Sequence, residues 1–340
     1  MTSLKTKKVS LKTIAEMAGC STTTVSNILN GKGLFGEKIR DKVMKLVKKY
    51  NYTINASARS LRMGKSETIA LVFYRPNVDI FKSEYYLTMM YGLQKRLAEL
   101  GFEILLSEVS QSDEEKNRQP RFVSRGKADA IVALGRVPEN IVKLLGASEL
   151  PMLMLDSYSE NVDSIYTDGK KATAEMTDHL VSLGHKNIAY FAYDNFDFNT
   201  DMRIKGFRQS VKKAGLEHSC RLYRNFKTNE EACGVFEDVL SRVDRPTAIL
   251  SSNDSIATSL ICRAQTLGLR IPQDVAFCGY DDTILAVSCT PNLTTAHVDC
   301  ALIGEFGAET VVSRLENPSA KTVVKIFNAP VVVRESTRGK

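Results

Sequence analysis

Short apolar runs alternate with helical stretches along most of this chain, and this alternation constrains the fold more than any other feature. The predicted strands are 68–74, 103–109, 130–134, 152–156, 188–193, 247–251 and 275–279. Helical stretches fall between most of them, for example at 85–100, 170–183, 229–242 and 254–267. Such alternation is typical of parallel sheets covered by helices. The chain from residue 67 onward is long enough for two such α/β lobes rather than one.

Polar side chains lie at or near the ends of several of these strands. Ligands of open parallel sheets bind outside the carboxyl ends of the strands, so we expect these side chains to line a cleft. The candidates are Asp156, Asn199, Arg203, Asn253 and Asp281. Carboxylate, amide and guanidinium groups together suit a polyol, whose hydroxyls both donate and accept hydrogen bonds. A purely structural role is equally compatible with the pattern at Asp156, Asn199 and Asn253, and we expect Asp254 and Asp282 to cap the helices that follow them.

Charge is distributed unevenly between the two ends of the chain. Residues 1–66 contain 14 Lys or Arg and 3 Asp or Glu, a net charge of +11, whereas the whole chain carries +7. The remainder is therefore mildly acidic. A basic N-terminal segment on an acidic body indicates a polyanionic partner for that segment alone.

Residues 9–30 have the pattern of two short helices joined by a tight turn. Gly19 supplies the left-handed geometry that ends the first helix, and Ser21 is a suitable N-cap for the second. The apolar positions are Leu11, Ile14, Ala15 and Ala18 in the first helix and Val25, Ile28 and Leu29 in the second. This pattern predicts a helix-turn-helix. A third helix with apolar residues at helical spacing, from Ile39 to Val47, would close its small core.

The second helix of such a motif enters the major groove of DNA, where its outward side chains meet base edges. The outward residues here are Thr22, Thr23, Ser26 and Asn27. Thr hydrogen-bonds to bases or contacts a thymine methyl, and Asn pairs with adenine. Other polar residues are better placed for phosphates, which fix the register without reading sequence. These are Lys12, Ser21, Thr24 and Asn30.

The N-terminal segment resembles the lac repressor family of bacterial regulators. The resemblance rests on the run LKTIAEMAGCSTTTVS, on Leu29-Asn30-Gly31, on Tyr52 and Asn55, and on ARSL at 58–61. In that family the last run is a hinge helix that folds only on an operator. By resemblance Leu61 is the wedge that enters the minor groove, with Ala58 one turn earlier and Arg59 beside the backbone. Asn27 and the Gly33–Gly36 segment depart from the usual family pattern, and we expect Gly36 to be a weak helix cap.

The resemblance continues through the body to about residue 336 and implies a fold like that of periplasmic sugar-binding proteins. It divides the chain into a DNA-binding domain at 1–54, a hinge and linker at 55–66, and a ligand-binding and dimerisation domain at 67–340. Lobe one would comprise about 67–167 and 298–326, and lobe two about 168–297 and 327–337. The fold class is therefore an all-α helix-turn-helix domain followed by an α/β body of two doubly wound parallel-sheet lobes.

The resemblance also implies site residues in the cleft between the lobes. Arg203 and Asp281 match the family's ligand-binding arginine and aspartate, and Asn253 matches the asparagine of its Asn-Asp pair. Tyr85 and Tyr86 align with an aromatic pair at the start of the first body helix. Phe226 is a candidate for stacking on a sugar ring. For all three aromatic residues, packing and ligand contact are equally compatible with the sequence.

The function implied is allosteric control of transcription. A homodimer would bind a near-palindromic double-stranded operator, and a small molecule, expected to be a sugar, would change its operator affinity. Repression is the expected output. The chain as given lacks the C-terminal leucine-repeat helix of the family's tetrameric members, which favours a dimer. The dimer contacts are expected on body helices such as 85–100.

Other functional classes lack support in the sequence. There is no phosphate-binding or dinucleotide glycine motif and no nucleophile elbow, so no enzyme activity and no cofactor are expected. The seven cysteines include no C-x-x-C pair, and the four histidines lack metal-ligand spacing. With neither a signal peptide nor a run of about 18 apolar residues, a cytoplasmic location away from membranes is expected. The alternatives are a cytoplasmic carbohydrate-binding protein or an α/β enzyme with an incidental basic N-terminal domain.

Overall fold

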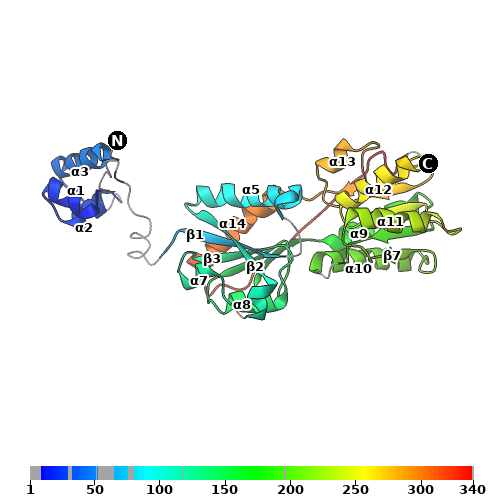
Figure 1. Cartoon of the computed structure of the whole chain (residues 1–340), viewed down its shortest axis with the longest axis horizontal. Coiled ribbons are helices and arrows are strands. Elements are labelled where there is room, and N and C mark those ends of the chain that lie inside the picture. Colours follow the sequence, from blue (N-terminus) through cyan, green and yellow to red (C-terminus); the bar gives the residue numbers. More distant parts are fainter. Residues whose placement is uncertain are drawn as a thin grey trace, which may run out of the picture. The chain divides into compact units, whose positions relative to one another are not determined.

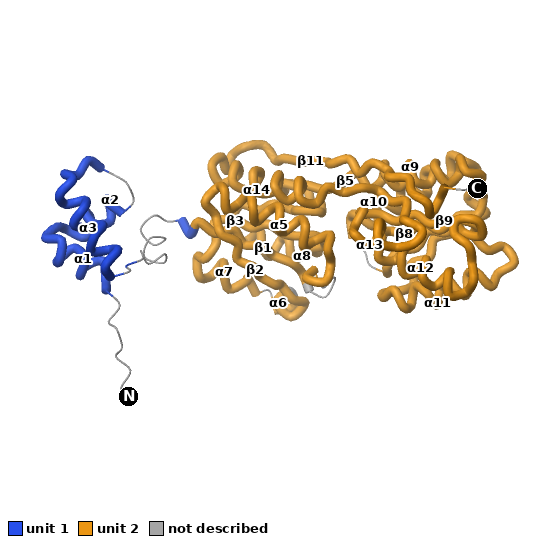
Figure 2. The backbone as a smooth tube through the Cα atoms, turned by 90° about the horizontal axis from the view of Figure 1, so that it is seen from above, with its two compact units in different colours: residues 1–66 blue, residues 67–340 orange. Residues whose placement is uncertain are grey.

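The computed structural model describes residues 9–29, 33–50, 52, 65–75, 80–116, 118–194 and 197–338. The chain forms two compact units, Met1–Ser66 and Glu67–Lys340, which Figure 2 shows in different colours. Each unit has its own hydrophobic core. The predicted hinge residues Ala58, Arg59 and Leu61, and Asn30 of the head, lie outside the described residues.

The N-terminal unit contains three helices, α1 (Leu11–Ala18), α2 (Thr22–Leu29) and α3 (Glu37–Lys49). Ser10 caps α1, and Gly19 ends it with a φ of 76°. Three helices of this length cannot bury much surface separately, so they share one small core. Its fully buried members are Ile14, Ala15, Ala18, Val25, Ile28 and Val43. Gly36 begins α3 without a side-chain cap, as expected from its lack of a side chain.

Lobe one of the body has a six-stranded parallel sheet in the order β11-β5-β4-β3-β1-β2. Its strands are β1 (Thr68–Arg75), β2 (Glu103–Ser110), β3 (Ala130–Leu134), β4 (Met152–Leu155), β5 (Asp163–Thr167) and β11 (Val324–Phe327). Helices cover both faces, which is why β3 is buried along its whole length. One face packs on α5 (Glu84–Glu99) and α14 (Cys300–Glu316), and the other on α8 (Glu139–Gly146) (Figure 1). Shorter elements of this lobe are η1 (Ile80–Lys82), α6 (Gln111–Glu115) and α7 (Arg121–Ser124).

Lobe two has a four-stranded parallel sheet in the order β7-β6-β8-β9. Its strands are β6 (Ile188–Phe191), β7 (Arg221–Tyr223), β8 (Ala248–Ser251) and β9 (Ala276–Cys278). Alternate residues point to opposite faces. Tyr190 therefore packs towards α9 (Gly169–Ser182) and α10 (Phe198–Lys213), and Phe191 towards α11 (Asn229–Leu240) and α12 (Asp254–Thr266). The short helix α13 (Ile284–Ser288) follows β9.

Glycines allow close helix crossings in both lobes. A Cβ atom on Gly304 of α14 would lie 2.1 Å from the carbonyl oxygen of Met89 in α5, and one on Gly92 equally close to that of Ala301. In lobe two, a Cβ on Gly206 of α10 would lie 2.1 Å from the Lys170 oxygen in α9. At these positions any residue larger than glycine would force the two helices apart.

The chain passes between the lobes three times. The passages follow β5, follow β10 (Thr295–Ala296) and follow β11, which leads into β12 (Val331–Val332). β10 and β12 pair in antiparallel fashion beside lobe two. The lobes are therefore linked by three connecting segments, and a cavity lies where the two lobes meet.

Candidate DNA-binding and ligand-binding sites

The second helix of the N-terminal unit presents most of the predicted base-reading residues. Thr22 and Thr23 are exposed, and Ser26 and Asn27 are half-buried, whereas Val25 and Ile28 point into the core. The exposed side chains lie in the first turn of α2, the part that reaches base edges in a helix-turn-helix. The structure thus brings the four residues together on one short helix.

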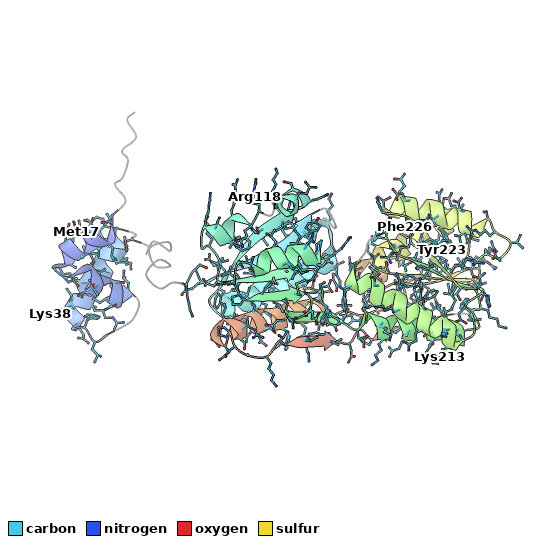
Figure 3. All side chains as sticks on the ribbon, turned by 90° about the horizontal axis from the view of Figure 1, so that it is seen from below. Met17, Lys38, Arg118, Lys213, Tyr223 and Phe226 are labelled. Carbon is cyan, nitrogen blue, oxygen red and sulfur yellow. The ribbon has the colours of Figure 1, made fainter. Side chains whose placement is uncertain are left out.

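Three of the predicted phosphate contacts also lie at the surface. The Ser21 hydroxyl accepts a hydrogen bond from the Thr24 backbone N–H at 3.0 Å, and the two hydroxyls lie 2.9 Å apart. Ser21 therefore caps α2, as its sequence position predicts, while remaining exposed. Lys12 is exposed on α1. In Figure 3, Lys38 marks α3 and Met17 marks α1 of the same unit.

In the body, a cavity of about 820 Å³ is lined by both lobes. Seven of the eight predicted ligand-binding residues line it, namely Tyr85, Tyr86, Asp156, Asn199, Arg203, Asn253 and Asp281. Its volume is within the range of small-molecule sites. Most of the polar residues among them follow the carboxyl end of a strand, as the position of ligands on open parallel sheets requires.

Arg203 is held rigidly at the cavity by lobe two. It is only 7% exposed, and its Nη1 donates a hydrogen bond to the Ser252 carbonyl at 2.6 Å. The guanidinium lies over the Tyr280 ring, 3.7 Å from its centroid. Burial opposes the charge of Arg203, but Asp281 and neighbouring groups raise the pKa of the guanidinium overall. The residue is therefore a fixed cation with donors left for a ligand.

Asp281 faces Arg203 without a hydrogen bond between them. The Arg203 Nη2 atom lies 3.6 Å from Asp281 Oδ1, beyond ordinary hydrogen-bond length. Asp281 Oδ1 and Arg203 Nε are both buried and have no hydrogen-bond partner. Burial raises the pKa of the Asp281 carboxyl well above its usual value, and Arg203 only partly opposes this. Buried polar atoms without partners are costly, so this pair has unmet hydrogen-bonding capacity.

Asp156 connects three of the predicted residues across the two lobes. Its Oδ1 accepts hydrogen bonds from the Tyr85 hydroxyl at 2.9 Å and from Asn199 Nδ2 at 3.0 Å. Asn199 also donates to the Asp156 carbonyl at 2.9 Å. Tyr85 and Asp156 belong to lobe one and Asn199 to lobe two. Burial raises the pKa of Asp156 to about 6, although Arg203 and these hydrogen bonds lower it.

Neither Asp254 nor Asp282 caps the helix that follows it, so both expected caps are wrong. Asn253 caps α12, because its Oδ1 accepts from the Ile256 N–H at 2.9 Å, and it lines the cavity as well. Asp254 was expected to cap but is buried, accepting from the Thr283 N–H at 2.8 Å and the Thr295 hydroxyl at 2.6 Å. Asp282, also expected to cap, instead forms ion pairs: its carboxylate oxygens lie 2.6 Å from Arg334 Nη2 and 2.9 Å from His297 Nδ1.

The expectation that Phe226 stacks on a ligand ring is wrong in this structure. Phe226 is 1% exposed and packs against Phe191 and Tyr193, at centroid distances of 5.9 and 5.8 Å. It lies with Tyr223 inside lobe two (Figure 3). The next residue, Lys227, lines the cavity instead. Sequence position alone did not indicate which of the two neighbours faces the cavity.

Several lining residues were missed from the sequence. They include Glu84, Arg136, Tyr193, Asp197, Lys227 and Ser255. Arg136 could have been found, because it comes two residues after a predicted strand. Tyr193 could also have been found, because it ends the predicted strand 188–193. The others belong to loops and helix starts outside the predicted strands.

Comparison with known proteins agrees with both halves of the structure. Residues 10–55 match the family of bacterial regulatory proteins named lacI, and residues 177–337 match a periplasmic binding protein-like domain. The regulator DegA of Bacillus subtilis is 30% identical over 97% of this chain and 98% of its own length. The repressor PurR of Vibrio vulnificus is 29% identical over 96% of this chain and 98% of its own.

Solved structures show the same fold. A lac repressor dimer bound to operator and the anti-inducer ONPF has a TM-score of 0.86 and 22% identity, covering 97% of this chain and 99% of that one. A complex of the regulator CelR with cellobiose has a TM-score of 0.70 and 23% identity, covering 96% of this chain and 99% of that one. A regulator from Enterococcus faecium with bound ribose has a TM-score of 0.69 and 22% identity, covering 79% of this chain and 98% of that one.

A helix-turn-helix unit joined to a two-lobed body with a cavity defines a DNA-binding transcription regulator. The chain belongs to the lacI family of bacterial regulatory proteins. No helix among the described residues is long and apolar enough to span a membrane.

Proposed function

We propose that this regulator represses transcription from a near-palindromic operator and that a polyhydroxylated small molecule in the cavity controls its operator affinity. The observation that carries the ligand proposal is the Arg203–Asp281 pair. It is buried at a cavity shared by two lobes, and it retains a donor and an acceptor without partners. A sugar hydroxyl satisfies both at once, because it accepts from Arg203 and donates to Asp281.

A sugar is the class of ligand that fits best with the relatives. Structures of similar fold hold cellobiose and ribose, and a ribose operon repressor of Haemophilus influenzae is 26% identical over 96% of this chain. The cavity of this chain offers carboxylate, amide and guanidinium groups together with tyrosine rings, the combination that holds a sugar ring. Asp156, Asn199 and Asn253 are the further polar contacts we propose, with Tyr85 and Tyr86 as the aromatic wall.

On the DNA, we propose that Thr22, Thr23, Ser26 and Asn27 read bases in the major groove. Lys12, Ser21, Thr24 and Asn30 would hold phosphates. Ala58, Arg59 and Leu61 would form the hinge helix, with Leu61 wedged into the minor groove of the operator. A segment of this length needs DNA and a second subunit to hold a helix, which couples its folding to binding.

Two subunits are needed for two half-sites, so we propose a homodimer acting in the bacterial cytoplasm. Helix α5 supports this, because its Leu87 and Tyr91 are 43% and 64% exposed. Ligand binding would change the angle between the lobes and hence the spacing of the two hinges. A coupling free energy of about 1–3 kcal/mol is enough for useful control.

Arg203→Ala tests the ligand site. We expect operator binding to persist and its response to sugars to disappear, because the guanidinium fork is lost. Operator affinity would be measured with and without a panel of common pentoses, hexoses and disaccharides. Arg208→Ala, an exposed position on the same helix, is the control and should respond as the wild type does. Arg203→Lys keeps the positive charge and is a second variant in case Arg203→Ala does not fold. If operator binding by both Arg203 variants responds to sugar as the wild type does, Arg203 is not part of the ligand site.

A further inference from the structure

Eight ionisable residues line the cavity, four acidic and four basic. They are Lys82, Glu84, Arg136, Asp156, Asp197, Arg203, Lys227 and Asp281. Three of the four acidic residues already accept a hydrogen bond from the protein. Glu84 accepts from the Ile284 N–H at 3.0 Å, and Asp197 accepts from the Thr200 N–H at 2.8 Å as the cap of α10. Asp156 accepts from side chains of both lobes.

Two of the basic side chains differ from these acidic ones in their partners. Within the described part of the chain, neither Arg136 nor Lys227 has a side-chain hydrogen bond or ion pair with another residue. Arg136 is half-buried and Lys227 is exposed. Several other arginines of the body are paired, for example Arg270 with Asp274 at 2.9 Å and Arg224 with Asp201 at 3.2 Å. The side-chain donors of Arg136 and Lys227 are therefore available to a ligand.

The backbone fixes Arg136 at the cavity. It follows β3 by way of Gly135, whose φ is 65°. A Cβ on Gly135 would lie 2.8 Å from the Tyr86 hydroxyl, so the turn packs directly against a lining tyrosine. Arg136 belongs to lobe one and Lys227 to lobe two, where it precedes Thr228, the N-cap of α11. The two cations thus enter the cavity from opposite lobes.

We infer that the ligand of this cavity carries an anionic group, a phosphate or a carboxylate, held by Arg136 and Lys227 while Arg203 and Asp281 hold its hydroxyls. This inference rests on the proposed function. A half-buried guanidinium without a partner is stabilised by an oxyanion, which it binds through two parallel hydrogen bonds. Lys227 adds a mobile point charge. A cavity of about 820 Å³ has room for a phosphorylated or oxidised monosaccharide.

The arrangement also gives the anion a role in control. An anion bound by both cations contacts both lobes, so it stabilises the arrangement in which they are close together. Arg203 and Asp281 tie a neutral sugar to lobe two. Its contacts with lobe one are those proposed for Asp156, Tyr85 and Tyr86. The anion would add a further contact with each lobe, and so add to the difference in affinity between two lobe arrangements that controls operator binding.

The test compares matched ligands on matched variants of the full-length protein. The probes are inorganic phosphate and two series: glucose, glucose 6-phosphate and glucuronate, and ribose with ribose 5-phosphate. Each is titrated calorimetrically against the wild type, Arg136→Gln, Lys227→Gln and the control Arg208→Gln. The change in melting temperature with each probe is recorded in parallel. Comparison of glucose 6-phosphate with glucuronate shows whether the cavity prefers a phosphate or a carboxylate.

We expect phosphate to raise the melting temperature of the wild type and a charged sugar to bind at least tenfold more tightly than its neutral parent. Either cavity substitution should weaken the charged sugar by about tenfold or more and leave the neutral parent unchanged. Neutral sugars that bind as tightly as charged ones, with an Arg203-dependent operator response, would overturn this inference and leave the proposed function standing. No binding of any probe, with an operator affinity that no sugar changes, would count against both.

Discussion

Asp156 and Asp281 each follow a strand of the body, and both have a left-handed backbone conformation, with φ of 60° and 108°. Such conformations in residues other than glycine cost about 1–3 kcal/mol and gather at functional sites. Here they turn two carboxylates from the ends of strands into the cavity. The strand-end rule found Asp156 and Asp281 from sequence. It could not find the strain itself, because backbone conformation at these positions depends on the folded sheet.

The ionisation of Asp156 gives a prediction at the scale of one residue. Burial raises its pKa from 3.8 to about 6. The folded chain thus binds this proton more tightly than the unfolded chain, and stability contributed by Asp156 falls as pH rises from about 4 to about 6. Relative to Asp156→Asn, we expect the wild type to gain about 2 kcal/mol in unfolding free energy between pH ~7.5 and pH ~4.5, which is most of the roughly 3 kcal/mol that the whole shift is worth. Urea unfolding at the two pH values measures this.

Asp274→Asn is the control for that experiment. Hydrogen bonds from Arg270 lower the pKa of Asp274 to about 2, so its contribution to stability is lost only below the pH range used. Its difference from the wild type should stay constant between the two pH values. The difference in unfolding free energy between the wild type and Asp156→Asn could instead stay constant or grow as pH rises. Either result would show that the pKa of Asp156 is not raised in the folded protein.

At the scale of elements, the strongly apolar strands and the body helices α5, α9, α11 and α12 were predicted, with ends within about three residues of those observed. Helices α10 and α14 and strands β5, β7, β10, β11 and β12 were not. The sequence of β5, Asp163–Thr167, mixes polar and apolar residues, and Asp163 is buried only because Arg314 pairs with it at 2.7 Å. β11 is an edge strand with three exposed residues out of four. Elements defined by distant partners leave little periodicity in their own sequence.

The crossing of α9 and α10 depends on a single glycine. Gly206→Ala would place a Cβ 2.1 Å from the Lys170 carbonyl oxygen, which is backbone and cannot move alone. We expect a loss of about 1–3 kcal/mol in unfolding free energy, measured by urea denaturation. Gly234→Ala is the matched control, because its Cβ meets nothing within 4 Å in α11. It should leave stability unchanged or raise it by about 0.5–1 kcal/mol. Equal effects from both substitutions would contradict the close crossing.

Substitutions on two helices of the N-terminal unit should weaken DNA binding in two distinguishable ways. Thr22→Ala removes an exposed hydroxyl from α2, so we expect it to weaken the preferred operator by about 1–3 kcal/mol with little effect on random DNA. Lys12→Gln removes a proposed phosphate contact. It should weaken binding to operator and to random DNA alike. The slope of log K against log salt concentration should become shallower by about one. Fluorescence anisotropy at several salt concentrations separates the two, and a reversal of the two patterns would contradict the proposed docking of α2.

At the scale of the whole molecule, the fold class and the family were confirmed, because both follow from long-range features of the sequence. The basic N-terminal segment, the helix-turn-helix spacing and the strand–helix alternation each persist over many residues. The cavity's composition was only partly predicted. Its lining comes from segments as far apart as 82–86 and 283–285, which the three passages between the lobes bring together. Sequence reasoning placed seven of its eight candidates at the cavity but missed other lining residues such as Arg136, Asp197 and Lys227.

The measurement that tests the central claim most directly is selection of bound sites from a random DNA pool by the full-length protein. It would be performed at near-physiological salt, with and without a mixture of neutral and phosphorylated sugars. We predict enrichment of a near-palindrome with an easily kinked central step, and a change in the enrichment when the sugars are added. Salt-sensitive binding without any enriched sequence, under both conditions, would contradict the account of a ligand-controlled operator-binding dimer.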